Sequence, residues 1–260
     1  MDIIQDKNRA SKGAVFNRTR GVKNKFEYIL EDHVALVTMI DGDNLINPDF
    51  VQECLDILDI IEKQTDARAL VVHSANPKTF SLGVDIEWAV KMLGQNEKDR
   101  VRKFFLELNN LFLRILLYPM PTIAAINGHV FGIGVVFGCC FDFRYMRSER
   151  GYLCMPEVDL GMPLIPGMLE ILKRVIPTTR LEQIQYTGRR YNAQECLEAG
   201  FATRVCPGEK LLDEAMAWVK VLDKKRNTIA EMKMRMHSGI VKVIQEQDPQ
   251  YISKGETIYA

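Results

Sequence analysis

The stretch from Asn127 to Asp142, NGHVFGIGVVFGCCFD, restricts the possible folds more than any other part of the sequence. It contains four glycines, no lysine or arginine, and a single acid at its far end. The apolar run TIAAI directly before it is typical of a buried strand. The pattern therefore predicts a strand, a glycine turn and a helix that is buried all round. The first amides of such a helix are unpaired and carry the positive end of its dipole, so they suit an anionic oxygen.

Two phosphate-binding motifs can be tested against this stretch. A dinucleotide fingerprint, GxGxxG, would need glycine at the position of Phe137, but the spacing is Gly132-x-Gly134-x-x-x-Gly138. A P-loop needs a Gly-Lys-Ser/Thr sequence, and the stretch has no lysine. Both motifs are disfavoured, which leaves the glycines either as an anion-binding turn or as a means of close packing.

The rest of the chain alternates between strand-like and helix-like patterns. A hairpin is expected around Glu31-Asp32, and helices follow over 47–64, with Asn47 as the cap, and over 98–117. The runs ARALVVHS, TIAAING and FDFRYM are expected as strands, and their alternation with helices indicates parallel βαβ units. After about residue 165 the patterns are helical. The 260 residues are thus expected to form an α/β core with a helical C-terminal part.

Charge and cysteine content disfavour several classes of function. The formal net charge is zero, so no overall field attracts nucleic acid or an anionic membrane, and no apolar run is long enough for a membrane span. The six cysteines lack CxxC spacing, which favours buried reduced thiols over a zinc site. Without a hydrophobic signal core or a Ser-Lys-Leu ending, a cytoplasmic location is expected. Basic residues gather in the first 25 positions, which we expect to be a solvated, loosely ordered arm.

Two further segments carry groups suited to chemistry. In PKTFSLGVDI, Gly83 is expected in a tight turn between a strand and a helix, as in the first stretch. Two such turns on nearby parallel strands would aim two backbone amides at one point, which is the geometry of an oxyanion hole. In YLCMPEVDLG, Glu157 has apolar neighbours, so a raised pKa would let it act as base and then acid near neutral pH. Alone, Glu157 could equally be a partly exposed acid at a helix start, and Asp159 could bond to local backbone.

In this order and spacing, TFSLGVDI, AAINGHVFGIGVVF and MPEVDLG resemble the crotonase (enoyl-CoA hydratase/isomerase) superfamily, from about residue 26 to about residue 247. The resemblance implies a crotonase (ClpP-like) α/β fold, in which repeated ββα units form a parallel-sheet core. It suggests an N-terminal arm at 1–25, the core at 26–205 and a C-terminal helical trimerisation region at 206–260. It also implies a homotrimer or dimer of trimers that acts on an acyl- or enoyl-CoA thioester. No metal and no cofactor are implied beyond the CoA of the substrate.

The same resemblance assigns roles to residues of the three segments. The amides of Val84 and Ile133 match the pair that polarises the thioester carbonyl, and Glu157 matches one of the two catalytic glutamates of the hydratases. The second glutamate would stand at Val136, which cannot transfer a proton. Contacts with the CoA moiety are expected from the two turns and from the lysine before the first of them: Lys78, Ser81, Leu82, Asp85 and Gly132.

Addition of water uses two proton-transferring groups, whereas a shift of a double bond needs one base that takes a proton from C2 and returns it at C4. The sequence therefore predicts a Δ3,Δ2-enoyl-CoA isomerase. Hydrolysis, decarboxylation or weak hydration of a CoA thioester, and a non-catalytic acyl-CoA-binding subunit, are the alternatives. Lys233 is a weaker candidate for a phosphate contact, and His73 and His129 are expected to be structural. Trp88 and the methionines at 232, 234 and 236 are expected to be packing residues or part of the acyl-pocket wall, and not catalytic.

Overall fold

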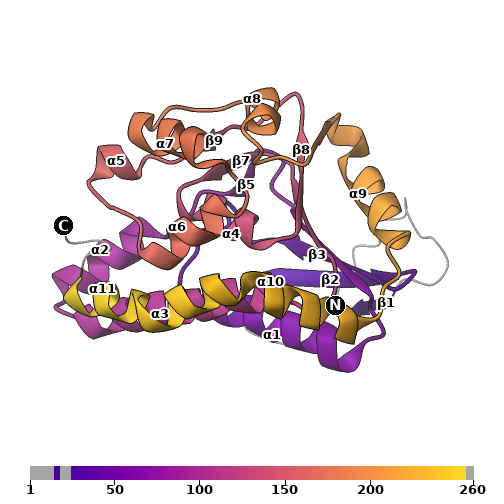
Figure 1. The fold of residues 1–260 in the computed structure, drawn as a ribbon, viewed down its shortest axis with the longest axis horizontal. Coiled ribbons are helices and arrows are strands. Elements are labelled where there is room, and N and C mark those ends of the chain that lie inside the picture. The colour runs from indigo at the N-terminus through magenta and orange to yellow at the C-terminus, as the bar shows by residue number, and fades with distance from the viewer. Residues whose placement is uncertain (1–14, 18–24, 256–260) are drawn as a thin grey trace, which may run out of the picture.

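The structure is a computed structural model that describes residues 15–17 and 25–255 (Figure 1). Its larger sheet has seven strands in the order β1-β2-β3-β4-β6-β8-β10. Strands β1 and β2 pair antiparallel, as do β2 and β3, and every later pair in this sheet is parallel. The strands are β1 (Val15–Asn17), β2 (Phe26–Glu31), β3 (Val34–Met39), β4 (Ala69–Ser74), β6 (Thr122–Ile126), β8 (Phe143–Arg147) and β10 (Arg204–Cys206).

The smaller sheet consists of three short parallel strands, β5 (Thr79–Ser81), β7 (His129–Phe131) and β9 (Leu153–Cys154). Each of them follows a strand of the larger sheet and precedes a helix. The successive units β4-β5-α2, β6-β7-α4 and β8-β9-α5 are therefore three ββα repeats, as the fold prediction required. The three short strands themselves were not expected from the sequence, because two or three residues are too few to show a period of two.

Helices cover both faces of the larger sheet (Figure 1). In β4, Leu70 and Val72 join the main core with α1, α3 and α4, whereas Ala69 and Val71 pack against α9. The strand is thus buried on both faces, which explains why its sequence is apolar without alternation. The helices are α1 (Pro48–Gln64), α2 (Ile86–Gly94), α3 (Lys98–Leu116), α4 (Ile133–Cys140), α5 (Glu157–Leu160), α6 (Pro166–Lys173), α7 (Thr178–Thr187), α8 (Ala193–Glu198), α9 (Leu211–Lys220), α10 (Arg226–Glu246) and α11 (Asp248–Lys254), with a 3₁₀ turn at Gly208–Lys210.

The elements expected from periodicity are confirmed. Strands β2 and β3 form the hairpin, and α1 begins after Asn47, whose side chain accepts a hydrogen bond from the amide of Phe50. Helix α4 is buried at every residue, as its lack of a polar face required. The expected N-terminal arm contains the edge strand β1, and its residues 1–14 and 18–24 lie outside the described residues. The boundaries at 25 and 205 stay predictions.

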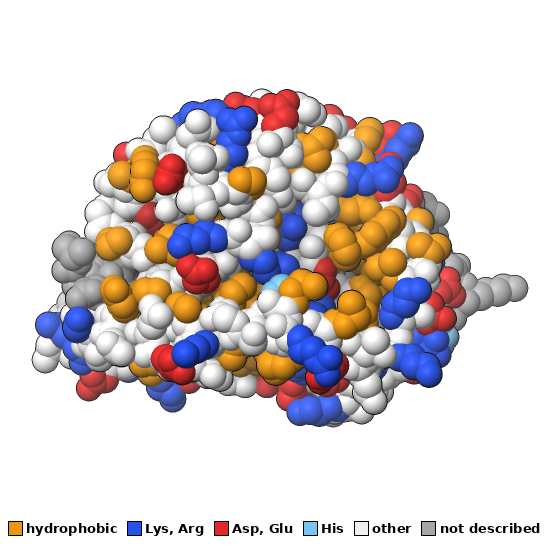
Figure 2. Space-filling view, in the orientation of Figure 1, with side chains coloured by type: hydrophobic (Ala, Val, Ile, Leu, Met, Phe, Trp, Pro, Cys, Tyr) orange, Lys and Arg blue, Asp and Glu red, His pale blue; other side chains and the backbone are white. Residues whose placement is uncertain are grey.

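The two last helices fold back over the core, with α10 along α6 and α3 and α11 against α3. The three methionines of α10 do not line the acyl cavity, and Met232, Met234 and Met236 are 47 to 71% exposed on this chain. The buried stripe of this helix is formed instead by residues that include Lys233 and His237. Figure 2 shows hydrophobic side chains gathering on the surface along α10 and beside α9. Among the described helices, none is both long and apolar enough to cross a membrane.

Candidate active site

The two glycine turns lie directly against each other. Gly83, between β5 and α2, has a φ of +86°, which lies in the left-handed region that glycine favours. A Cβ atom at this position would lie 2.8 Å from the carbonyl oxygen of Phe131 and 3.1 Å from the amide nitrogen of Ile133. Any other residue would push the loop after β5 away from the turn before α4. The two turns therefore meet, as their sequences indicated.

The amides of Val84 and Ile133 are not used by the secondary structure. Ile133 is the first residue of α4 and follows Gly132, which has φ +52° and ψ −127°. Val84 forms an isolated bridge with Ile46, but the amides that make this bridge belong to Ile46 and Asp85. Neither the Val84 nor the Ile133 amide donates a hydrogen bond to another described residue. Both are available to an oxygen atom in the cavity that the two residues line.

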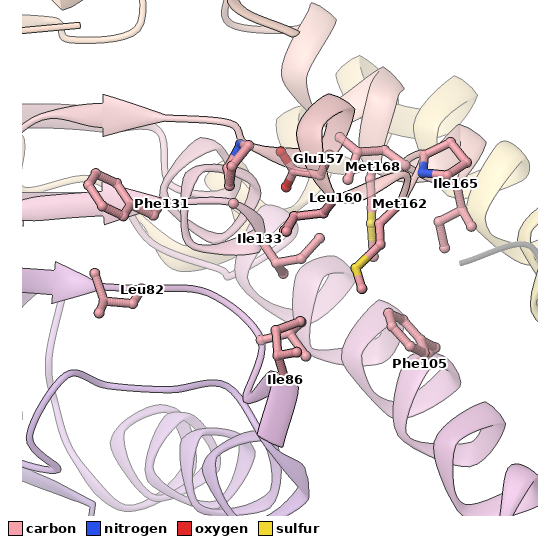
Figure 3. A pocket seen from close by; sticks show the side chains of 15 residues that line it. Leu82, Ile86, Phe105, Phe131, Ile133, Glu157, Leu160, Met162, Ile165 and Met168 are labelled. Atoms are coloured by element: carbon pink, nitrogen blue, oxygen red, sulfur yellow. The ribbon is translucent and has the colours of Figure 1, made fainter. Parts of the chain in front are cut away.

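This cavity has a volume of about 280 Å³ and lies between the turns, α3 and the segment that leads into α6 (Figure 3). Its walls are apolar, and Glu157 is the only ionisable side chain among the described residues that line it. Figure 3 shows the apolar side chains around a space next to the Glu157 carboxylate. They include Ile86, Phe105, Leu160, Met162, Ile165 and Met168.

Glu157 is brought to the turn of Gly132 by the small sheet. Strand β9 pairs with β7, and the amide of Gly132 donates to the carbonyl oxygen of Cys154 at 2.9 Å. Glu157 follows three residues later, at the start of α5, and its Oε1 would lie 3.2 Å from a Cβ atom on Gly132. Its Oε2 is buried and has no hydrogen-bond partner among the described residues. Burial raises the pKa of Glu157 from 4.5 to about 7, so the carboxylate can both take up and release a proton near neutral pH.

Two of the predicted contact residues shape the first turn and do not line the cavity. The hydroxyl of Ser81 donates to the carbonyl oxygen of Asn44 and accepts from the amide of Gly83. Asp85 caps α2 by accepting from the amide of Trp88, and it also accepts from the side chain of Asn47. By contrast, the predicted residues Leu82 and Gly132 line the cavity itself. Direct contact with a ligand stays a prediction for all four.

The lysines named from the sequence lie elsewhere. Lys78 lines a second pocket, together with His129, at the other end of β5 and β7. Lys233 is buried in an ion pair of 2.6 Å with Asp142 and donates to the carbonyl oxygen of Met120, so it is structural. His73 hydrogen-bonds to Thr38, and burial lowers its pKa to about 4, which fits the structural role expected of it.

Sequence reasoning missed the distant apolar walls of the cavity. Phe105 comes from α3 and Met168 from α6, and no local pattern links these helices to the glycine turns. The two helices are tied together by Asp248, which is fully buried at the start of α11 and accepts from the side chain of Asn109 on α3 and the amide of Gly167 on α6. The last helix therefore braces the cavity from outside and contributes no lining residue.

At Val136, the position expected for a second acid, the side chain is apolar and has no access to the cavity. Val136 lies in the first turns of α4, is fully buried, and does not line the cavity. It joins the main core, so no proton-transferring group reaches the cavity from this helix. Trp88 likewise packs edge-on against Phe104, with 5.1 Å between the ring centroids, which confirms its expected packing role.

Several known proteins resemble this chain in sequence and in structure. A sequence model described as enoyl-CoA hydratase/isomerase matches residues 30–253. An Arabidopsis thaliana protein named enoyl-CoA delta isomerase 2, peroxisomal, is 28% identical over 162 residues, which cover 62% of this chain and 68% of the relative. A putative enoyl-CoA hydratase from Thermus thermophilus is 30% identical over 201 residues, covering 75% and 77%. The crystal structure of a probable enoyl-CoA hydratase from Mycobacterium tuberculosis has the same fold, with a TM-score of 0.80 at 24% identity and coverage of 89% and 95%.

Proposed function

Because the chain belongs to the enoyl-CoA hydratase/isomerase family, we propose that it is an isomerase that converts a 3-enoyl-CoA thioester into the 2-enoyl-CoA thioester. The thioester oxygen accepts hydrogen bonds from the amides of Val84 and Ile133. The acyl chain extends from there into the apolar cavity, past Phe105 and Met168. No group other than the substrate is required for this reaction.

Glu157 carries the proton in both steps. Its carboxylate removes a proton from C2, and the electron pair of that C–H bond moves into the thioester to form an enolate held by the two amides. The same carboxyl group returns the proton at C4, so the double bond moves from C3–C4 to C2–C3 and Glu157 is ionised again. Each amide of an oxyanion hole typically lowers the barrier by about 3 to 4 kcal/mol, and a positioned base contributes about 10²–10⁴-fold.

One observation carries the choice of isomerisation over hydration: Glu157 is the only ionisable side chain among the described residues that line the cavity. Hydration of a 2-enoyl-CoA requires that water be activated and that a carbon atom be protonated. A pair of acids shares these two tasks. At Val136 the chain offers a buried aliphatic side chain. The name of the Arabidopsis relative supports the same choice, whereas that of the Thermus relative names a hydratase.

The test is the substitution Glu157→Gln, which keeps the shape of the side chain and removes its acid-base function. Turnover of a 3-enoyl-CoA should fall by at least about 10²-fold, while the binding of the thioester persists. Asp159→Asn is the matched control, because this acid lies on the same short helix, is exposed and does not line the cavity. Full activity of Glu157→Gln, or equal losses in both variants, would rule the proposal out.

We also propose that the protein assembles as a homotrimer or dimer of trimers through its C-terminal helices. The exposed apolar side chains along α10, among them Met232 and Met236, support this assembly because large exposed apolar patches favour association. Light scattering of the purified protein should give three or six times the mass of one chain. The mass of a single chain would contradict it.

A further inference from the structure

Asp248 is a buried acid that the proposed reaction does not use. It is the first residue of α11, and none of its surface is exposed. Burial raises the pKa of Asp248, and the hydrogen bonds from Gly167 and Asn109 lower it in part. No cation among the described residues pairs with it. A buried carboxylate costs free energy unless hydrogen bonds compensate, and apolar side chains of the same shape are often as stable. Fold stability alone therefore does not explain this side chain.

The two carboxylate oxygens of Asp248 hold two different helices. Oδ1 accepts a hydrogen bond of 2.8 Å from the amide of Gly167, the second residue of α6. Oδ2 accepts one of 2.9 Å from the side chain of Asn109 on α3. The N-cap of α6 is Ile165, which has an apolar side chain and makes no capping bond. Asp248 therefore caps α6 from another helix, and its charge lies at the positive end of α6.

The approach of Asp248 to α6 depends on glycine at position 167. A Cβ atom on Gly167 would lie 2.3 Å from Oδ2 of Asp248 and 2.4 Å from a side-chain carbon of Ile244. The φ of Gly167 does not lie in the left-handed region, so the close packing, and not the turn geometry, requires glycine here. A larger residue would push α6 away from α10 and α11. The sequence of α6 is thus fitted to this carboxylate.

Both helices that Asp248 holds form walls of the catalytic cavity. Asn109 lies four residues after Phe105 on α3, and residues with this spacing share one face of a helix. Gly167 directly precedes Met168 on α6. Phe105 and Met168 line the cavity, and Figure 3 shows them on different sides of it. The carboxylate of Asp248 therefore joins the two walls to each other.

The reacting groups lie on elements that the Asp248 side chain does not bond to. Val84 precedes α2, Ile133 begins α4 and Glu157 begins α5. Among the described residues, the hydrogen bonds of the Asp248 carboxylate go only to α3 and α6. The walls on these two helices are thus left to contact the acyl chain beyond its reacting carbons, C2 to C4. A change at Asp248 should therefore affect how the acyl chain binds more than how the proton moves.

We propose that Asp248 is a positioning residue that holds the two walls of the acyl end at a fixed separation and so sets the preference of the enzyme for longer acyl chains. This inference rests on the proposed function, because it takes the acyl chain of a CoA thioester as the ligand of these walls. Each methylene group buried between apolar walls strengthens binding by about fourfold. A gap of roughly 0.5 to 1 Å forfeits about a quarter to a half of each dispersion contact. Walls that separate therefore lose the gain for each added methylene group.

The experiment measures kcat and KM for 3-butenoyl-, 3-hexenoyl- and 3-octenoyl-CoA. In Asp248→Ala, KM for 3-octenoyl-CoA should rise by about tenfold, roughly the contribution of two methylene groups, and KM for 3-butenoyl-CoA by less than about twofold. The kcat should stay similar for all three substrates. A merely structural role would instead lower the active fraction of the protein, and so the apparent kcat, equally for every acyl chain.

Two further variants control for structural damage. Asp248→Asn should keep the wild-type length dependence, because its Oδ1 can accept from Gly167 and its Nδ2 can donate to Oδ1 of Asn109, which is buried without a partner among the described residues. Thr122→Val is the matched control, because it removes a buried hydroxyl that hydrogen-bonds to Asp142 and does not line the cavity. It should leave the length dependence unchanged.

Equal losses for all three acyl chains, an unchanged length preference in Asp248→Ala, or a Thr122→Val variant with the same length-dependent loss would overturn the assignment. If Asp248→Ala does not fold, Asn109→Ala takes its place, because it breaks one of the two bonds and leaves Gly167 capped. This variant should reduce the preference for 3-octenoyl-CoA over 3-butenoyl-CoA by at least about threefold. A preference equal to that of the wild type would overturn the assignment in this case as well.

Calorimetric titration with butanoyl-CoA and octanoyl-CoA separates this inference from the proposed function, because these saturated thioesters bind without isomerisation. A wild-type protein that binds octanoyl-CoA more tightly, and loses most of that preference in Asp248→Ala, supports the role of Asp248 even if isomerisation fails. A preference that survives in the variant, or that is absent from the wild type, contradicts this role even if isomerisation is found.

Discussion

Replacing Glu157 by glutamine should make the fold more stable at pH 8, although the same change removes the proposed base. The carboxylate is buried beside Gly132 with an unpartnered Oε2, and this burial raises its pKa to about 7 from an ordinary value of 4.5. A difference of this size corresponds to about 3 kcal/mol of free energy against the ionised folded state. The native protein carries this destabilisation above pH 7, where Glu157 is ionised in both the folded and the unfolded chain.

The sign of the pH dependence follows from the raised pKa. Below pH 4.5 the carboxyl group is protonated in both states and destabilises neither, so the penalty grows as the pH rises from 4.5 to 7 and is complete above that. The stability gained by Glu157→Gln should therefore fall from about 3 kcal/mol at pH 8 to below about 1 kcal/mol at pH 5.

Urea denaturation at the two pH values measures this gain, with Asp159→Asn as the control for an exposed acid of the same helix. A constant offset from the buried amide of glutamine would affect both pH values equally and would leave their difference unchanged. A gain that is independent of pH, or that is larger at pH 5, would refute the reasoning about Glu157.

Three further outcomes follow from the same geometry. The kcat/KM for a 3-enoyl-CoA should rise with pH to a plateau, because the base Glu157 must be ionised. Half of the maximum should be reached near pH 7, and kcat/KM should fall about tenfold for each pH unit below that. A profile that is flat between pH 5 and 8 would contradict this. Gly83→Ala should lower kcat by about 10²–10³-fold, because the added methyl group would lie 2.8 Å from the Phe131 carbonyl oxygen and would displace one of the two oxyanion-hole amides. Circular dichroism checks that the fold persists. A normal kcat would show that the two glycine turns need not touch. Lys233→Ala should destabilise the fold by about 3 to 5 kcal/mol, because it leaves Asp142 without its buried ion-pair partner. In urea denaturation, the loss of stability should be well above that caused by Lys242→Ala on the exposed side of α10.

The sequence predicts the two glycine turns and the buried helix α4 well because their constraints are local. A turn that needs positive φ at Gly83 or Gly132 must use glycine, and a helix without a polar face must be buried, so both features can be recognised from a few residues. Glu157 between apolar neighbours is a signal of the same kind. The short strands β5, β7 and β9 carry no such signal, because their form depends on pairing between segments far apart in the chain.

The rest of the site depends on packing that no local pattern shows. Phe105 and Met168 reach the cavity only because α3 and α6 are held together, in part by Asp248 from the last helix. The methionines of α10 were expected to pack or to line the acyl pocket, but the buried stripe of that helix contains Lys233, whose charge is compensated by Asp142. Lys233 and Asp142 are far apart in the sequence, so their ion pair forms only because the fold brings them together.

The central claim is that this protein moves a double bond and does not add water. The most direct measurement incubates the purified protein separately with a 3-enoyl-CoA and with the matching 2-enoyl-CoA, and follows the products by chromatography and mass spectrometry. We predict rapid formation of 2-enoyl-CoA from the first substrate and, from the second, 3-hydroxyacyl-CoA at least about 10²-fold more slowly, because Glu157 alone cannot supply both groups that hydration uses. Hydration that is as fast as isomerisation would contradict the claim.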